Sequence, residues 1–201
     1  MRVTVIDYKA GNLTSVLKAL RHLGAETVVT DGDLALVEAA ERIVLPGVGH
    51  FAATERLDST VLTSAIRAAI ARGAPFLGIC VGMQWLYAGS SEAPAQPGLA
   101  HFTETCARFS DSKEKVPHVG WNSLEIRPNS RLLAGVDPGE YVYFTHSYKA
   151  PVTADAAATT YYIEPFASAV ERGNVMGVQF HPEKSGATGL KILGNFLEWE
   201  G

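Results

Sequence analysis

The sequence predicts an α/β fold with an open, mostly parallel sheet, helices on both faces and some antiparallel strands in the C-terminal half. In the first half, short apolar runs alternate with stretches of helical spacing. Parallel neighbours need such crossover connections, which place helices on the faces of the sheet. Between residues 124 and 180, short alternating strands dominate instead. With 201 residues, no internal repeat and no linker, we expect one domain over 1–201.

The first half of the chain begins as strand, turn and helix. Residues 2–7 read as an apolar strand that runs into a turn at 8–12, and the apolar residues from Leu13 then follow helical spacing until Gly24. The same unit then recurs. We expect strands at 26–30, 42–45 and 75–79, a short helix capped by Asp33, and a helix that starts at Ser59 or Thr60 and ends at Gly73.

The second half is richer in short strands. Residues 90–98 combine proline, glycine and small polar side chains, which is typical of a surface loop. A final helix near 188–199 directs its leucines and Phe196 toward the core. Further strands are expected at 105–109, 141–145, 159–163, 167–171 and 175–180.

Composition excludes several classes of protein. The 17 basic side chains are scattered and outnumbered by 21 acidic ones, so a nucleic-acid partner is not expected. No apolar run is long enough to span a bilayer and the N-terminus lacks a signal-peptide core, so we expect a cytoplasmic protein. Cys80 and Cys106 are the only cysteines and form no metal-binding pattern, so we expect free thiols, no metal and no cofactor.

The first motif that indicates chemistry is Gly78-Ile79-Cys80-Val81-Gly82, between a predicted strand and a helix expected near Met83. Glycines on both sides of a nucleophile are typical of a sharp strand-to-helix turn that has no room for side chains. The start of a helix also favours a thiolate over a thiol. A lone cysteine in such a turn is usually a small buried residue, but the paired glycines favour a nucleophile at Cys80.

The second motif is Gln179-Phe180-His181-Pro182-Glu183, at the end of another predicted strand. In an extended segment, side chains two residues apart point to the same side, so His181 and Glu183 can share a face. A carboxylate beside an imidazole fixes its tautomer and stabilises the imidazolium. The other five histidines have no acidic residue two positions away, so we choose His181 as the base. Cys106 has no flanking glycines and is expected to be a packed thiol.

The third motif is the glycine-rich turn Pro46-Gly47-Val48-Gly49, after a third predicted strand. In open α/β sheets, sites form outside the carboxyl ends of the strands, where this turn, Cys80 and His181 are all expected. Backbone N–H groups at Val48, Gly49 and Val81 could then hold an oxyanion. An isolated turn of this kind usually has no ligand, but three such features at one edge favour the oxyanion site.

Three segments, LPGVGHF, LGICVGMQ and GVQFHPEKS, together resemble the class I glutamine amidotransferases, whose catalytic triad is Cys, His and Glu. The segments DYKAGNL, PHVGWN and THSY narrow the resemblance to the glutaminase subunits of imidazole glycerol phosphate synthase, of histidine biosynthesis. The resemblance covers nearly the whole chain. It implies that Cys80 attacks glutamine, that His181 moves the protons and that Glu183 orients His181.

The same resemblance implies a substrate pocket and a partner. Five residues would line the glutamine pocket: Gly49, Gln84, Glu92, His146 and Ser147. The acidic Glu92 suits the α-ammonium of the substrate. The implied partner is a (β/α)8-barrel cyclase subunit, which would form a heterodimer with this chain and receive its ammonia. Candidate interface residues are Asn12, Trp121, Asn122 and Lys184.

Other functions are compatible with parts of the pattern. A glutaminase of another pathway, such as anthranilate, carbamoyl phosphate or pyridoxal phosphate synthesis, shares the triad, but PHVGWN argues against it. A free-standing cysteine hydrolase or peptidase could use the same nucleophile and base. A non-enzymatic α/β binding module is the remaining class, and intact Cys80 without activity would favour it.

Overall fold

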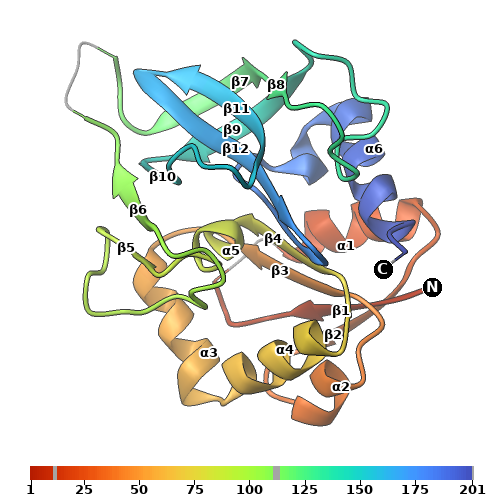
Figure 1. Cartoon of the computed structure of the whole chain (residues 1–201). Coiled ribbons are helices and arrows are strands. Elements are labelled where there is room, and N and C mark those ends of the chain that lie inside the picture. The colour runs from red at the N-terminus through yellow and green to blue at the C-terminus, as the bar shows by residue number, and fades with distance from the viewer. Residues whose placement is uncertain (11–12, 111–113, 201) are drawn as a thin grey trace.

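The main sheet of the protein has eight strands, and the computed structural model describes residues 1–10, 13–110 and 114–200 (Figure 1). Its strands are β1 (Arg2–Ile6), β2 (Glu26–Thr30), β3 (Ile43–Gly47), β4 (Phe76–Cys80), β8 (Glu125–Ile126), β11 (Ala156–Tyr162), β12 (Glu164–Arg172) and β13 (Val175–Val178). Their order is β2-β1-β3-β4-β13-β12-β11-β8. The first five run parallel and the last three join in antiparallel pairs, which confirms the predicted fold class.

Helices lie on both faces of this sheet. The helices α1 (Leu13–His22) and α6 (Gly186–Leu197) pack together on one face, and α2 (Leu34–Glu38), α3 (Glu55–Ser59) and α4 (Leu62–Ala71) cover the other (Figure 1). Asp33 caps α2 as predicted, because its carboxylate accepts the Leu36 N–H at 3.1 Å. In α4, the buried side chains are Leu62, Ala65, Ile66 and Ala69, which is the spacing of one helical face.

The predicted start of the long helix at Ser59 or Thr60 is wrong. A short 3-10 turn, η1 (Phe51–Thr54), leads into α3, and Ser59 is the last residue of α3. The hydroxyls of Ser59 and Thr60 donate back to the Arg56 carbonyl, so neither is free to cap a following helix. Val61, with a left-handed φ of 62°, then turns the chain into α4.

Two small sheets lie beside the antiparallel side of the main sheet. The strand β7 (His118–Ser123) pairs antiparallel with β9 (Tyr141–His146), and β5 (Gly89–Ser90), β6 (Thr105–Arg108) and β10 (Tyr148–Lys149) form the other sheet. The strand predicted at 105–109 is confirmed by β6. The loop expected at 90–98 starts one residue later, because Ser90 belongs to β5 and pairs with β6.

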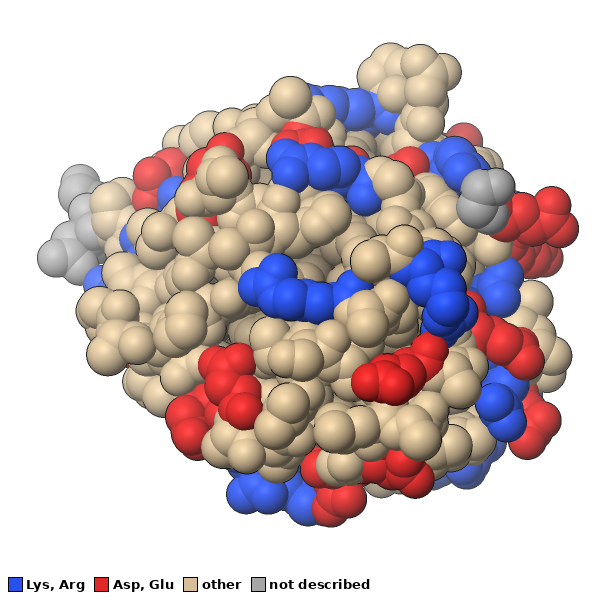
Figure 2. All heavy atoms as spheres, turned by 60° about the horizontal axis from the view of Figure 1, so that its bottom comes forward, with Lys and Arg blue, Asp and Glu red and all other residues tan. Residues whose placement is uncertain are grey.

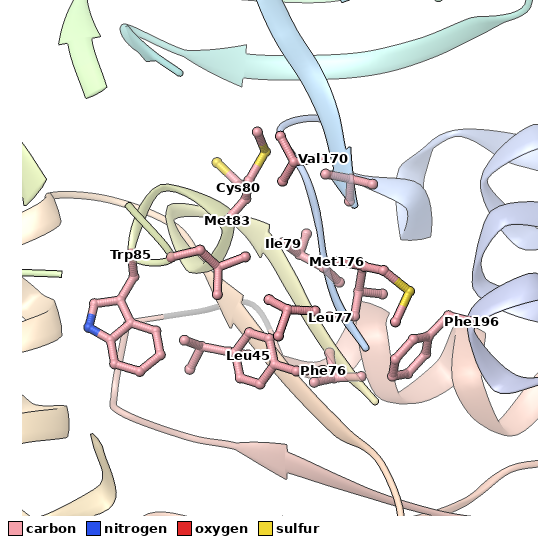
Figure 3. Close-up of a cluster of buried hydrophobic side chains, with 14 of the residues drawn as sticks. Leu45, Phe76, Leu77, Ile79, Cys80, Met83, Trp85, Val170, Met176 and Phe196 are labelled. Atoms are coloured by element: carbon pink, nitrogen blue, oxygen red, sulfur yellow. The ribbon is translucent and has the colours of Figure 1, made fainter. Parts of the chain in front are cut away.

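The central parallel strands are buried along their whole length. Every residue of β3, β4 and β13 is buried. Figure 3 shows Cys80 at the edge of an apolar cluster that includes Leu45, Met83 and Trp85. The carboxyl end of β4 is therefore fixed on a rigid, closely packed base.

The surface carries charges of both signs. On the face turned forward in Figure 2, acidic and basic side chains are interspersed. Among the residues that the structure describes, no helix is long and apolar enough to cross a membrane.

Candidate active site

Cys80 is the last residue of β4 and immediately precedes the single-turn helix α5 (Val81–Gln84). Its backbone has φ 55° and ψ −109°, a conformation that costs a non-glycine residue about 1–3 kcal/mol. This is the sharp strand-to-helix turn that the sequence predicts. The helix, however, begins at Val81 and has only four residues, so its dipole is weaker than the prediction assumed.

The glycines around Cys80 are required by close backbone contacts. A Cβ on Gly78 would collide with the Gly82 carbonyl, and a Cβ on Gly82 would collide with the Leu45 carbonyl. A Cβ on Gly47, in the neighbouring strand β3, would meet the buried Tyr8 hydroxyl and the Val81 side chain. The nucleophile turn is therefore packed directly against the carboxyl end of β3.

His181 and Glu183 form a buried pair. The Nδ1 atom of His181 lies 2.9 Å from Oε1 of Glu183, and each side chain is 2% exposed. The prediction that the two share a face is borne out, but the extended geometry expected between them is wrong. Pro182 begins a 3-10 turn, η2 (Pro182–Lys184), and this turn brings the carboxylate within hydrogen-bonding distance of Nδ1.

A serine fixes the segment that carries this pair. The Ser185 hydroxyl donates to the His181 carbonyl at 2.6 Å and accepts the N–H of Tyr143, in β9, at 3.0 Å. The His181 N–H donates in turn to the Tyr143 carbonyl at 2.9 Å. The backbone of the base is therefore tied to β9 on both sides, which limits the positions its ring can take.

The environment of His181 favours the imidazolium. Burial lowers its pKa, but its interactions with the Cys80 sulfur and the Glu183 carboxylate outweigh burial and raise the pKa to about 9. Its Nε2 atom is buried and has no formed hydrogen bond within the described part of the chain. A nucleophile and base that are close but not fully hydrogen-bonded are common before substrate binds.

The glycine-rich turn supplies fewer oxyanion donors than the sequence suggested. The N–H of Val48 donates to the Ala10 carbonyl at 2.9 Å, so in this conformation it is not offered to a ligand. Gly49 has a φ of 94°, which suits glycine, and it lines the cavity together with Val81, the first residue of α5. The backbone N–H groups of Gly49 and Val81 are the donors that this geometry leaves for an oxyanion.

The residues predicted to form the substrate pocket line one cavity of about 260 Å³. Its walls bring together segments that are far apart in the sequence: the glycine-rich turn, the turn at Cys80 with α5, and the residues from the end of β9 to the start of β10, together with Glu92 and Pro117. The lining residues include Val48, Gly49, Cys80, Val81, Gln84, Glu92, His146 and Ser147.

Glu92 is held in this cavity by a backbone contact. One of its carboxylate oxygens accepts the Phe51 N–H at 2.8 Å. The side chain is therefore anchored to the turn that follows Gly49 and is not a freely solvated loop carboxylate. Its negative charge beside the cavity suits a cationic group on a ligand.

His146 lines the cavity, but both of its ring nitrogens form hydrogen bonds with other residues of the protein. Its Nδ1 atom donates to the Tyr148 carbonyl at 2.9 Å, because a carbonyl can only accept. Its Nε2 atom must then accept, at 3.1 Å, a proton from Nδ1 of His118. With both ring nitrogens occupied, the imidazole cannot also bind a ligand as the sequence resemblance implied.

His118 was not among the predicted site residues. It is 3% exposed and stacks on Tyr162, with 4.0 Å between ring centroids. Burial lowers the pKa of His118 to about 4 and, as the largest cause, that of His146 to about 3, so both imidazoles stay neutral near pH 7. The short motifs PHVGWN and THSY are the signal for this pair, since β7 and β9 place His118 directly opposite His146.

The remaining cysteine and histidines lie outside the cavity. Cys106 is fully buried, and burial raises the pKa of its thiol, as expected for a packed residue. His22 is exposed. His101 is half-buried and packs edge-on against Phe102.

The predicted interface residues fall in different environments. Trp121 is 55% exposed on β7, so it does not pack in the core. Lys184 is exposed, with its Nζ atom 5.9 Å from the ring centroid of Tyr143. Asn122 is half-buried and donates to the Tyr161 carbonyl at 3.0 Å. Asn12 lies outside the described residues.

Comparison with known proteins assigns the same chemistry that the site suggests. Residues 4–199 match the family model described as glutamine amidotransferase class-I. The chain is 46% identical to the imidazole glycerol phosphate synthase subunit HisH of Deinococcus radiodurans, covering 96% of this chain and 92% of that protein. It is 45% identical to the HisH subunit of Rhodospirillum rubrum, over 99% of both chains.

Solved structures share the fold at lower sequence identity. A structure described as a glutamine amidotransferase superposes with a TM-score of 0.76 at 19% identity, covering 98% of this chain and 97% of the other. The structure of PurLQS from Thermotoga maritima gives a TM-score of 0.73 at 21% identity, with the same coverage. These likenesses support the assignment of the fold.

Proposed function

The chain belongs to the class I glutamine amidotransferases and, within them, to the HisH glutaminase subunits of imidazole glycerol phosphate synthase, and we propose that Cys80, His181 and Glu183 are its catalytic triad. The observation that carries this proposal is that the buried imidazole of His181 interacts both with the sulfur of the strained Cys80 and with the Glu183 carboxylate. Gly49 and Val81, whose backbone N–H groups are the proposed oxyanion donors, line the cavity that Cys80 also lines. The whole chain would act as one glutaminase domain that needs no metal or cofactor.

In the proposed mechanism, the Cys80 thiolate attacks the side-chain carboxamide of L-glutamine. The N–H groups of Gly49 and Val81 stabilise the tetrahedral oxyanion. His181, as imidazolium, gives its proton to the amide nitrogen, and ammonia leaves as the C–N bond breaks. His181 then takes a proton from water, which attacks the thioester and releases glutamate and the Cys80 sulfur. Glu183 stabilises the imidazolium each time it forms.

The cavity supports glutamine as the substrate. Glu92, anchored by the Phe51 N–H, would bind the α-ammonium group. The Gln84 side chain uses its Nε2 hydrogens for the Tyr148 carbonyl and for Oε1 of Gln179, each at 3.0 Å. Its own carbonyl oxygen is then the group that it can offer to the substrate. Gly49 and Ser147 complete the proposed pocket, and His146 contributes the surface of its ring.

We infer that the partner is a cyclase subunit with a (β/α)8 barrel, and that the two form a heterodimer in the cytoplasm. The exposed face of β7 and β9 supports a docking surface near the cavity. Val119 is 56% exposed, Trp121 55% and Tyr141 58%, and Thr145 of the same face lines the cavity. Exposed apolar side chains beside a catalytic cavity are suited to a protein interface that also excludes water.

Ammonia release with and without the cyclase tests the proposed function. We expect slow glutamine hydrolysis by the chain alone and faster hydrolysis when its cognate cyclase and the cyclase ligand are added, measured as glutamate formed. Equal turnover in both conditions would count against coupling to the partner. No glutamate in either condition would contradict the glutaminase assignment.

Trp121→Ala tests the docking surface. We expect weaker cyclase binding by about thirtyfold or more in Kd, because a large exposed aromatic at an interface centre typically contributes about 2 kcal/mol or more. Isothermal titration calorimetry measures this change. The control is Val29→Ala, another exposed apolar position, on the edge strand β2 far along the sheet. Equal affinity of both variants would place the interface elsewhere.

A further inference from the structure

Gln179 lies against the proposed nucleophile and has no part in the mechanism described so far. Its side-chain Nε2 atom is 3.6 Å from the Cys80 sulfur, within hydrogen-bond range for sulfur. The residue is fully buried and follows β13, next to β4 in the sheet. A buried amide directed at a reactive sulfur is a contact that water cannot replace.

The orientation of the Gln179 amide follows from its neighbours. The Tyr148 carbonyl can only accept, so the atom of Gln84 that lies 3.0 Å from it is the Nε2 donor. The same Nε2 atom lies 3.0 Å from Gln179, which must therefore present its Oε1 acceptor to Gln84. The remaining group of Gln179, the Nε2 donor, faces the sulfur.

The Tyr148 carbonyl that begins this sequence of contacts is itself fixed from a second direction. It accepts the Nδ1 proton of His146 at 2.9 Å. His146 is held by His118, and Nε2 of His118 lies 3.4 Å from the Asn122 amide on β7. Donors and acceptors thus alternate from Asn122 to the sulfur, and each contact fixes the orientation of the next.

We propose that Gln179 is a further catalytic residue, whose amide N–H donates to the Cys80 sulfur and stabilises the thiolate, with Gln84 as the positioning residue. The inference rests on the proposed function of Cys80 as nucleophile. A thiolate accepts a hydrogen bond more strongly than a thiol does, so the donor favours ionisation. The single turn of α5 offers little dipole for this purpose, which leaves the side-chain amide as a specific source of stabilisation.

The test is the pH dependence of Cys80 alkylation by iodoacetamide in the isolated full chain, with the modified residue identified by mass spectrometry. In Gln179→Met, which removes the donor without adding charge, we expect the midpoint of the profile to move about one pH unit upward. On the acidic limb the reaction would then be about tenfold slower. Gln84→Met should move the midpoint in the same direction by less, because the amide of Gln179 then loses its anchor.

Two further variants make the result decisive. Gln179→Asn keeps a neutral amide but is too short to hold both contacts, so it should reproduce the shift if Gln179→Met does not fold. Ser168→Ala is the matched control, because Ser168 is buried on β12 and its backbone carbonyl, which the substitution keeps, accepts the Gln179 N–H. Folded Gln179 variants with the profile of the unmodified chain would overturn the proposal.

The alkylation assay is separate from the test of the proposed function. It requires neither glutamine nor the cyclase, so an unchanged profile rejects the role of Gln179 whatever the ammonia assay shows. Conversely, a chain that releases no ammonia with its partner would contradict the glutaminase function even if Gln179 shifts the profile.

Discussion

Replacing Cys80 with alanine is expected to abolish glutamine hydrolysis. The change removes the only atom that can form the thioester, and loss of a covalent nucleophile costs on the order of 10⁵ to 10⁶ in rate. The fold should persist, because alanine is smaller and Cys80 packs at the edge of the apolar cluster (Figure 3). Glutamate formation in the presence of the cyclase measures the activity, and circular dichroism checks the fold.

The second cysteine provides the control for this experiment. Cys106→Ala should retain activity, because its buried thiol does not line the cavity and has no role in the proposed reaction. Undiminished ammonia release by Cys80→Ala would refute the nucleophile. Loss of activity in both variants would point to a folding defect instead.

Glu183→Gln is expected to lower the rate of ammonia release by between about a hundredfold and ten-thousandfold. The carboxylate 2.9 Å from Nδ1 of His181 stabilises the imidazolium, and a neutral amide cannot do so. Steady-state glutamate formation with the cyclase present measures the loss. Glu55→Gln on α3, an exposed residue, is the control and should leave the rate unchanged.

The same variant should also change the pH dependence. In the folded chain the pKa of His181 is raised from 6.5 to about 9, so the imidazolium persists at neutral pH and is lost as the pH rises through 9. Activity of the unmodified enzyme should therefore fall above about pH 9. In Glu183→Gln the pKa of His181 is lower and the fall should begin at lower pH. An identical alkaline limb in both proteins would argue that Glu183 does not act on His181.

Much of the fold could be predicted because apolar periodicity dominates the first half of the chain. The strand at 26–30 was located correctly from its local run of β-branched residues, and the cap at Asp33 from a contact with the nearby Leu36 N–H. The helix start at Ser59 failed because two hydroxyls bond backward to Arg56, a choice that local propensity does not reveal. The strand β7 was missed because half of its residues are polar and its apolar residues form no continuous run.

The candidate site, like the fold, could be predicted from the sequence only in part. Cys80, His181 and Glu183 stand in short motifs with a specific chemical meaning, so the sequence was sufficient to propose them as a triad. Gln179 was not recognised because its role depends on the orientation of an amide, which only the three-dimensional contacts decide. The occupied N–H of Val48 is likewise visible only once Ala10 is placed beside it.

The left-handed backbone at Cys80 has an evolutionary consequence. A glycine would relax at this position without penalty, so mutations that improve thermal resistance should accumulate there in any lineage that no longer needs glutamine hydrolysis. Glutaminase activity and thermal stability therefore favour different residues at position 80. A library screened only for heat tolerance would therefore tend to return variants without glutaminase activity. Selection for ammonia supply retains the cysteine despite the cost of its backbone conformation.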